Sequence, residues 1–154
     1  MAKRDLVTYA GAEGTKFATV NLSFRIGARC ENQREDVLLL QTLFKYIGWS
    51  QGASKNNLGT DISSLPATTG ILDGKTQQTI WNFQGKNRRH LLNVDGLIHP
   101  ANYAGRSIKG PFPLMAIHLL NNMALDEALM KNDTAKDYIA GLIAMTPQLE
   151  PFLS

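Results

Sequence analysis

The feature that most constrains the fold is a turn that occurs twice, at Thr69–Thr76 and at Asp95–Asn102. Each copy has a polar residue, then glycine, then two aliphatic residues, then a residue that starts a helix or forms a turn. Gly70 and Gly96 supply the positive φ angle of a tight turn, and the polar residue before each one can hydrogen-bond the turn's own backbone. Because the two copies bracket a helix-like segment at Thr76–Gln84, the sequence predicts a helix held between two tight turns.

A second helix is predicted before the first turn. Asn32 and Glu35 have the spacing of a capping box at its start, and Gly48 is placed to end it in a left-handed conformation. The segment Trp49–Pro66 is rich in Ser, Asn and Gly, which predicts a long exposed loop of a kind that is often functional. The apolar residues of the helix recur at helical spacing and form one stripe: Val37, Leu40, Leu43, Phe44 and Ile47.

The ends of the chain have their own patterns. Thr19–Ile26 alternates polar and apolar residues, which predicts a strand that pairs with Leu6–Tyr9 and packs on the helices. The buried face of that strand is expected to hold Val20, Leu22, Phe24 and Ile26.

Two amphipathic helices are predicted after the prolines Pro111 and Pro113. One covers Leu114–Met130, and the other follows a cap at Thr134 and Asp137 and is stopped by Pro147 and Pro151. Each needs a partner surface, which is either the rest of this chain or a groove for another protein.

These elements together resemble the peptidoglycan-binding-domain-like family, a small three-helix module found attached to cell-wall enzymes. In that family an Asp–Val pair starts the first helix, a Leu–Gln pair lies within it, a turn leads into a second helix ending Phe–Gln, and a second Asp-Gly turn follows. The matching residues here are Asp36, Val37, Leu40, Gln41, Gly48, Thr69–Thr76, Phe83, Gln84 and Asp95–Pro100. Thr69 replaces the first Asp of the family, Asp73-Gly74 replaces a Gly–Pro pair, and the loop between Gly48 and Gly70 is longer.

The segment Gly27–Val37 is also similar to a variant of this family in Gram-negative bacterial proteins, with a Gly-rich turn and an Asn–Arg pair before the Asp–Val helix. Some of these modules travel with contractile secretion systems or phage-like machinery. The resemblance implies a mainly α fold with a three-helix peptidoglycan-binding-like core at 32–110. An N-terminal β-hairpin extension at 1–31 and a C-terminal helical extension at 111–154, packed on the core, complete the expected organisation.

Composition narrows the class of protein. The chain of 154 residues is 44% hydrophobic and 19% charged, which is typical of a folded globular protein. A formal net charge of +3 is small for a nucleic-acid binder, and the densest basic run, Lys86–His90, is expected to be solvated, so we predict no nucleic-acid partner. Cys30 is the single cysteine, which excludes an intramolecular disulfide.

Targeting signals are not evident in the sequence. Met1–Leu6 lacks the apolar stretch of a secretory signal, and no apolar run reaches the length of a membrane span. We therefore expect no membrane insertion and a chain that is cytoplasmic at synthesis. Delivery to the periplasm would then use a route other than general secretion.

The sequence contains no pattern that indicates catalysis. The histidines His90, His99 and His118 are far apart, without the spacing of a zinc site, so we expect no metal and no cofactor. Asp73 and Asp95 could be imagined as the two carboxylates of a glycoside hydrolase, but both occupy turn positions, where a structural role is expected. We therefore predict that the protein is not an enzyme; a small wall hydrolase ranks third among the interpretations.

The resemblance implies a non-catalytic module that binds bacterial peptidoglycan. The alternative is a protein-interaction or adaptor subunit of a secretion-system or phage-like apparatus, with the 49–66 loop or the terminal helices as its interface. For a glycan, exposed aromatic faces and amide or cationic side chains are the expected contacts. The candidate ligand-binding residues are Trp49, Trp81 and Tyr103 as stacking platforms, with Gln84, Asn87 and Arg88 to meet peptide-stem carboxylates.

Overall fold

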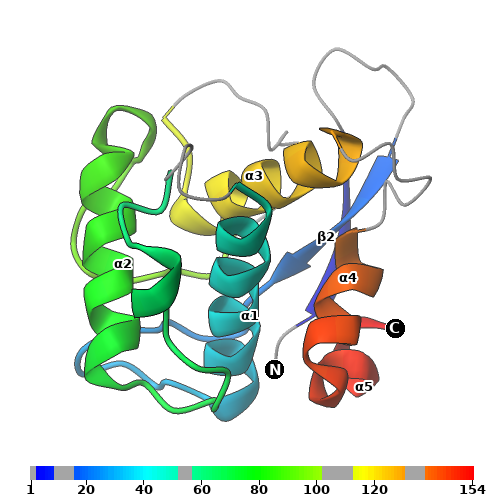
Figure 1. Ribbon diagram of the computed structural model, residues 1–154, viewed down its shortest axis with the longest axis horizontal. Helices are drawn as coiled ribbons and strands as arrows, with labels where there is room; N and C mark the ends of the chain where they lie inside the picture. Colours follow the sequence, from blue (N-terminus) through cyan, green and yellow to red (C-terminus); the bar gives the residue numbers. More distant parts are fainter. Residues whose placement is uncertain (1–2, 9–15, 52–56, 102–112, 131–137) are drawn as a thin grey trace.

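The protein is mainly helical, with one two-stranded antiparallel sheet (Figure 1). The computed structural model describes residues 3–8, 16–51, 57–101, 113–130 and 138–154. The strands are β1 (Lys3–Thr8) and β2 (Lys16–Asn21), and the longer helices are α1 (Arg34–Gln51), α2 (Gly74–Lys86), α3 (Ala116–Met130) and α4 (Tyr138–Met145). Short helical turns are η1 (Ile62–Ser64), η2 (Arg88–His90), η3 (Pro147–Leu149) and α5 (Glu150–Leu153).

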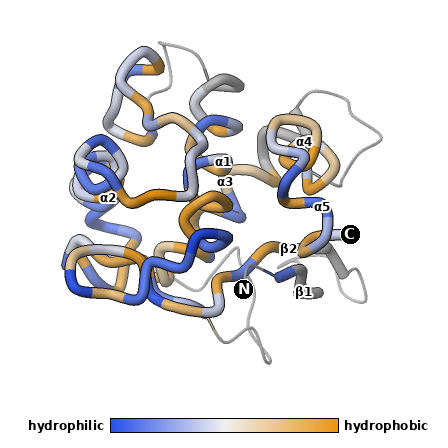
Figure 2. The backbone as a smooth tube through the Cα atoms, turned by 90° about the horizontal axis from the view of Figure 1, so that it is seen from below, coloured by the Kyte–Doolittle hydropathy of each residue, from blue (hydrophilic) through white to orange (hydrophobic). Residues whose placement is uncertain are grey.

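Helix α1 is the centre of the molecule. In Figure 1 it lies between α2 on one side and α4 on the other, with α3 crossing at one end. Every side chain from Asp36 to Ile47 is buried except that of Lys45, so α1 is covered on almost all sides and not along a single stripe. Figure 2 shows the contrast with α2, which lies at the edge of the molecule and carries mainly hydrophilic residues.

The N-terminal strands form the predicted hairpin, with Lys3 opposite Asn21 and Thr8 opposite Lys16. The free edge of β2 is covered by a side chain from α3. The Asn121 amide accepts a hydrogen bond from the Val20 backbone N–H at 2.9 Å and donates one to the Val20 carbonyl at 2.8 Å. A side-chain amide therefore pairs with β2 as a third strand would.

The strand ends five residues earlier than its alternating pattern predicts. The carboxylate of Asp36 accepts hydrogen bonds from the backbone N–H groups of Ser23 and Phe24, both at 3.0 Å, and so draws this segment toward the start of α1. Val20, Leu22 and Ile26 are buried as expected, but Phe24 is 41% exposed. The prediction for Phe24 was wrong because a buried carboxylate, and not a neighbouring strand, binds the backbone there.

Helix α1 begins at Arg34, within the predicted segment, but the predicted capping by Asn32 and the predicted end at Gly48 were wrong. Asn32 bonds the N–H and the carbonyl of Gly27, each at 2.8 Å, and so organises the preceding loop instead of capping the helix. Gly48 does not end the helix, which continues to Gln51. A Cβ atom on Gly48 would lie 2.6 Å from Leu65 Cδ1, so this glycine serves the close approach of the following loop.

That loop is less exposed than its composition predicts. Its first residues belong to α1, and Leu58 and Pro66 are buried, while η1 is exposed. Residues 52–56 lie outside the described part of the chain. The loop therefore has anchors on the core at both of its described ends.

The C-terminal helices pack on the rest of the molecule. Gly141 of α4 lies against the ring of Tyr46 in α1, with an added Cβ only 2.7 Å from Cε2. The hydroxyl groups of Thr42 and Thr146 are 2.8 Å apart, which joins α1 to the end of α4. The predicted cap at Thr134 and Asp137 lies outside the described residues.

Candidate functional site

The first of the two repeated turns is held by a glutamine of α1. The Gln41 side-chain oxygen accepts hydrogen bonds from the N–H groups of Thr69 and Gly70, and its nitrogen donates to the Ile71 carbonyl, all at 2.9 Å. The Thr69 hydroxyl accepts a bond from the Ile71 N–H at 3.2 Å. Gly70 has a φ of 76°, a conformation that costs little only for glycine.

The second turn is held in the same way by a glutamine of α2. The Gln84 side-chain oxygen accepts a bond from the Gly96 N–H at 2.7 Å, and its nitrogen donates to the Leu97 carbonyl at 2.8 Å. Asp95 accepts a bond from the Leu97 N–H at 3.0 Å, and Gly96 has a φ of 75°. Gln84 is fully buried, so it is not a surface contact for a ligand, and its prediction as a binding residue is corrected.

Above the second turn lies a half-exposed tryptophan. Trp81 is 45% exposed, as expected, and its indole rests on Gly96, where an added Cβ would lie 2.5 Å from the ring. One turn further along α2, Gly85 has no neighbouring atom within 4 Å of an added Cβ. Because a helical residue covers the side chain about one turn before it, a glycine at position 85 leaves the indole open to solvent.

An exposed cation follows α2 in the sequence. Arg88 lies seven positions after Trp81, just beyond the end of α2, in the exposed turn η2. It forms no ion pair with any residue that the structure describes. We call the surface made by Trp81, Gly85, Arg88 and Gly96 the Trp81 surface.

The remaining predicted site residues do not join this surface. Asn87 is 7% exposed and donates from its amide to the carbonyls of Asn57 and Phe83 at 2.7 and 2.9 Å, so it joins α2 to the preceding loop. Its prediction as a ligand contact is corrected, because the amide binds backbone. Trp49 belongs to α1, but its side chain lies outside the described part of the structure, as does all of Tyr103.

The two carboxylates considered for hydrolysis both have local structural partners. Asp73 caps α2 by accepting bonds from the N–H and the hydroxyl of Thr76, at 2.8 and 2.6 Å. The hydrogen bond from the Thr76 hydroxyl is the main reason why the pKa of Asp73 lies below its ordinary value. Burial raises the pKa of Asp95, but hydrogen bonds from His99, 3.0 Å away, and from the Leu97 N–H outweigh it, so the net shift is downward.

Asp36 differs from these two acids because it is fully buried. Burial raises its pKa above the ordinary value, and the bonds from the Ser23 and Phe24 N–H groups oppose that rise only in part. Its partners are backbone groups of the segment after β2, so its role is structural. The sequence indicated only that Asp36 begins a helix.

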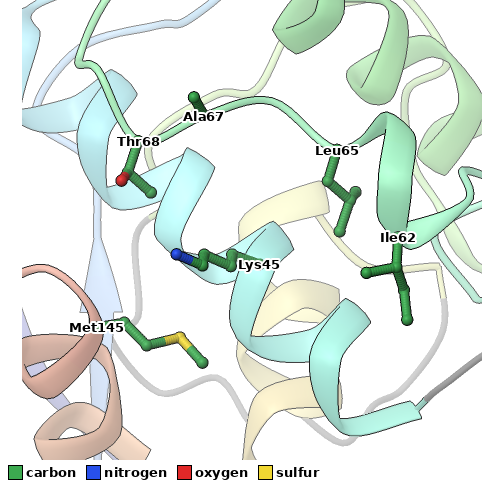
Figure 3. Close-up of a pocket in the computed structure, with 6 residues that line it drawn as sticks. All are labelled: Lys45, Ile62, Leu65, Ala67, Thr68 and Met145. Carbon is green, nitrogen blue, oxygen red and sulfur yellow. The ribbon is translucent and has the colours of Figure 1, made fainter.

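A cavity of about 420 Å³ was not expected from the sequence. Its lining comes from α1 (Lys45), from the loop around η1 (Ile62, Leu65, Ala67 and Thr68) and from the end of α4 (Met145), as Figure 3 shows. One signal was available in the sequence. Lys45 interrupts a long apolar segment of α1, and a cation in such a segment marks the point where the helix reaches solvent.

No three His, Cys, Asp or Glu residues among those described are grouped so that they could hold a metal ion. In the same part of the chain, no helix combines the length and the apolar character needed to cross a membrane. Comparisons with protein-family models, with curated proteins and with solved structures found no match.

Proposed function

We propose that the protein is a non-catalytic binding module for bacterial peptidoglycan and that the Trp81 surface is its binding site. The observation that carries this proposal is the half-exposed indole of Trp81, which is supported from below by the Gly96 turn and left uncovered by Gly85. A tryptophan at the surface with a rigid support is suited to stacking against a sugar ring. An indole held in place also loses little conformational entropy when a ligand binds.

The polar groups around the indole complement the chemistry of a wall polymer. The guanidinium of Arg88 would bind a carboxylate of the peptide stem, since a guanidinium can form two parallel hydrogen bonds to a carboxylate. The amides of Gln78 and Asn82, bonded to each other at 2.8 Å, lie on the outer side of α2 and offer partners for sugar hydroxyls. No bond of the ligand is made or broken in this role.

The proposal of a three-helix peptidoglycan-binding-like core draws support from the two glutamines. Gln41 and Gln84 are the positions that carry the resemblance to that family in the first and second helices. Each is buried and makes an equivalent set of bonds to the turn that follows its helix. These two glutamines therefore hold two turns against two helices.

A non-enzymatic role is supported by the positions of Asp73 and Asp95. A glycoside hydrolase needs one carboxyl group to donate a proton and another to attack or to activate water. Asp73 caps a helix, and Asp95 bonds its own turn and His99, with the pKa of each held below its ordinary value. Such carboxyl groups are poor proton donors near neutral pH.

The test is co-sedimentation with purified peptidoglycan sacculi across a salt series, beside a basic protein of similar size and charge. We expect saturable binding that persists at about 0.3 M salt, where exposed charges are largely screened. Gly85→Leu should block binding, because the new side chain covers the indole yet enters open space and favours the helix. Leu92→Ala, which truncates another half-exposed side chain, is the matched control for Trp81→Ala, and Lys75→Ala is the control for Arg88→Ala.

Binding no stronger than that of the basic control protein would contradict the proposal. An adaptor subunit of a secretion-system or phage-like apparatus would then become the leading hypothesis, and a pull-down from the native host would be the next experiment. Loss of binding in Leu92→Ala or Lys75→Ala to the same extent as in Trp81→Ala or Arg88→Ala would also contradict the assignment of the site.

A further inference from the structure

A cavity beside Lys45 opens to solvent between α1, the loop around η1 and α4. Lys45 is the one residue of α1 between Asp36 and Ile47 whose side chain is exposed. Figure 3 shows this side chain running from α1 between Ala67 and Thr68 of the loop and Met145 of α4. The volume of about 420 Å³ lies within the range of roughly 300–1,000 Å³ found for small-molecule sites.

Contacts with the rest of the molecule hold the walls of the cavity in place. The loop wall is anchored where Leu65 packs against Gly48 and where Gln41 binds the N–H groups of Thr69 and Gly70. The α4 wall is anchored next to Met145 by the bond between the Thr42 and Thr146 hydroxyl groups at 2.8 Å. The cavity is therefore formed before any ligand arrives, which lowers the entropic cost of binding.

The lining combines apolar side chains with one cation and one hydroxyl group. Ile62, Leu65, Ala67 and Met145 are apolar, and Lys45 and Thr68 are polar. Among the described residues, Lys45 has no ion-pair partner and no carboxylate lines the cavity. Ile62 is 47% exposed, so part of the apolar lining faces solvent.

We propose that this cavity binds a small aliphatic carboxylate. The Lys45 ammonium and the Thr68 hydroxyl would bind the carboxylate, and the hydrocarbon chain would lie against Ile62, Leu65 and Met145. Octanoate, with a chain of about eight carbons, is small enough to enter a cavity of about 420 Å³ and serves as the probe. The flexible thioether of Met145 can adapt to the exact length of the chain. This ligand is separate from the wall polymer proposed for the Trp81 surface.

The experiment uses the full chain with ¹³C-labelled methionine methyl groups, titrated at neutral pH with sodium octanoate below its micellar range and followed by NMR. The Met145 methyl signal, assigned with Met145→Leu, should shift saturably, while that of Met123 in α3 stays in place. Octan-1-ol has the same chain without the charge and should bind about tenfold more weakly.

Variants of the cation separate a built site from general adsorption. Lys45→Met keeps most of the side chain and removes the charge, so it should weaken octanoate binding about tenfold, whereas Lys45→Arg should retain it. Lys75→Met removes an exposed charge on α2 and should have no effect. Lys45→Met should also leave sacculus binding unchanged, so a failure of this proposal is distinguishable from a failure of the one before it.

Three outcomes would overturn the proposal. The first is the absence of a saturable Met145 shift, and the second is equal affinity for octanoate and octan-1-ol together with no effect of Lys45→Met. The third is tighter binding of a short peptide that ends in leucine, which would identify the cavity as a docking site for the C-terminus of a protein partner.

Discussion

The two repeated turns are held by similar hydrogen bonds but present different surfaces. At the first turn the glycine lies against Arg34, with an added Cβ only 2.6 Å from Cγ and 3.0 Å from the carbonyl oxygen, and Ile71 beyond it is 66% exposed. At the second turn the glycine lies against the indole of Trp81. The glutamine and the glycine therefore build the turn, and the residue that covers the glycine decides what the surface can bind.

The largest expected effects come from removing the glutamines. Gln41→Ala leaves two N–H groups and a carbonyl without their partner, and should lower the free energy of unfolding by about 3 kcal/mol. Gln84→Ala leaves one N–H group and one carbonyl without their partner and should lower the free energy of unfolding by about 2 kcal/mol. Urea denaturation measures both. Costs below about 0.5 kcal/mol, the typical range for surface substitutions, would show that these amides do not hold the turns.

Substitution of the two turn glycines should distinguish the turns by their spectra. Gly70→Ala and Gly96→Ala both force alanine into a left-handed conformation, at a cost of about 1–2 kcal/mol each. Only Gly96→Ala displaces Trp81, so only this variant should shift the tryptophan emission to longer wavelength. Gly85→Ala is the control for stability. Gly85 lies in α2, the helix that carries Trp81, and an added Cβ enters open space there, so this variant should be slightly more stable. An equal emission shift in Gly70→Ala would contradict the contact between Trp81 and Gly96.

The pH dependence of stability should differ in sign between Asp36 and Asp73. The pKa of Asp73 is lowered in the folded state. Its ionised form therefore adds to the free energy of unfolding above the unfolded-state pKa of 3.8, and this contribution is lost as the pH falls through the lower pKa of the folded state. The pKa of Asp36 is raised in the folded state, so its ionised form lowers the free energy of unfolding above that folded-state pKa. This loss is relieved as the pH falls toward the unfolded-state pKa of 3.8.

Urea denaturation from neutral pH to pH 3 measures these contributions as differences from the variants Asp36→Asn and Asp73→Asn. On acidification, the wild type should gain stability relative to Asp36→Asn and lose it relative to Asp73→Asn. The same sign for both pairs would show that burial does not control the ionisation of Asp36.

The smallest expected effect comes from making the first turn more like the second. Thr69→Asp replaces a hydroxyl acceptor by the carboxylate found at Asp95, and the position is exposed. Both side chains can accept the bond from the N–H two residues on, so the stability should change by no more than about 0.5 kcal/mol. Thermal denaturation of this variant, beside Thr69→Ala, measures the contribution of that bond. A cost for Thr69→Asp as large as that for Thr69→Ala would show that the two turns are not equivalent.

Much of the local structure could be predicted from the sequence, because short-range chemistry decides it. Asp73, for which a structural role was expected, caps α2, and Ile80 and Phe83 are buried on one face of that helix. The pattern around each turn glycine likewise predicted a tight turn with positive φ at Gly70 and Gly96.

Partners distant in the sequence explain what was missed. Gly48 was predicted to end α1, but its small size serves Leu65, which no local pattern shows. Gln84 and Asn87 were predicted as ligand contacts because amides bind polar ligands, yet the same chemistry binds buried backbone. The cavity beside Lys45 needed three separate segments to be placed together.

The pairing of Asn121 with Val20 has a consequence for how the chain folds. The two residues are separated by 101 positions, and the Thr42–Thr146 bond spans 104. Contacts between such distant positions form slowly, since a long loop must close before they stabilise anything. During synthesis, the edge of β2 stays unpaired until α3 has left the ribosome. Throughout that interval the nascent chain offers an open strand edge to its neighbours, and a chaperone that shields this edge would raise the yield of folded protein.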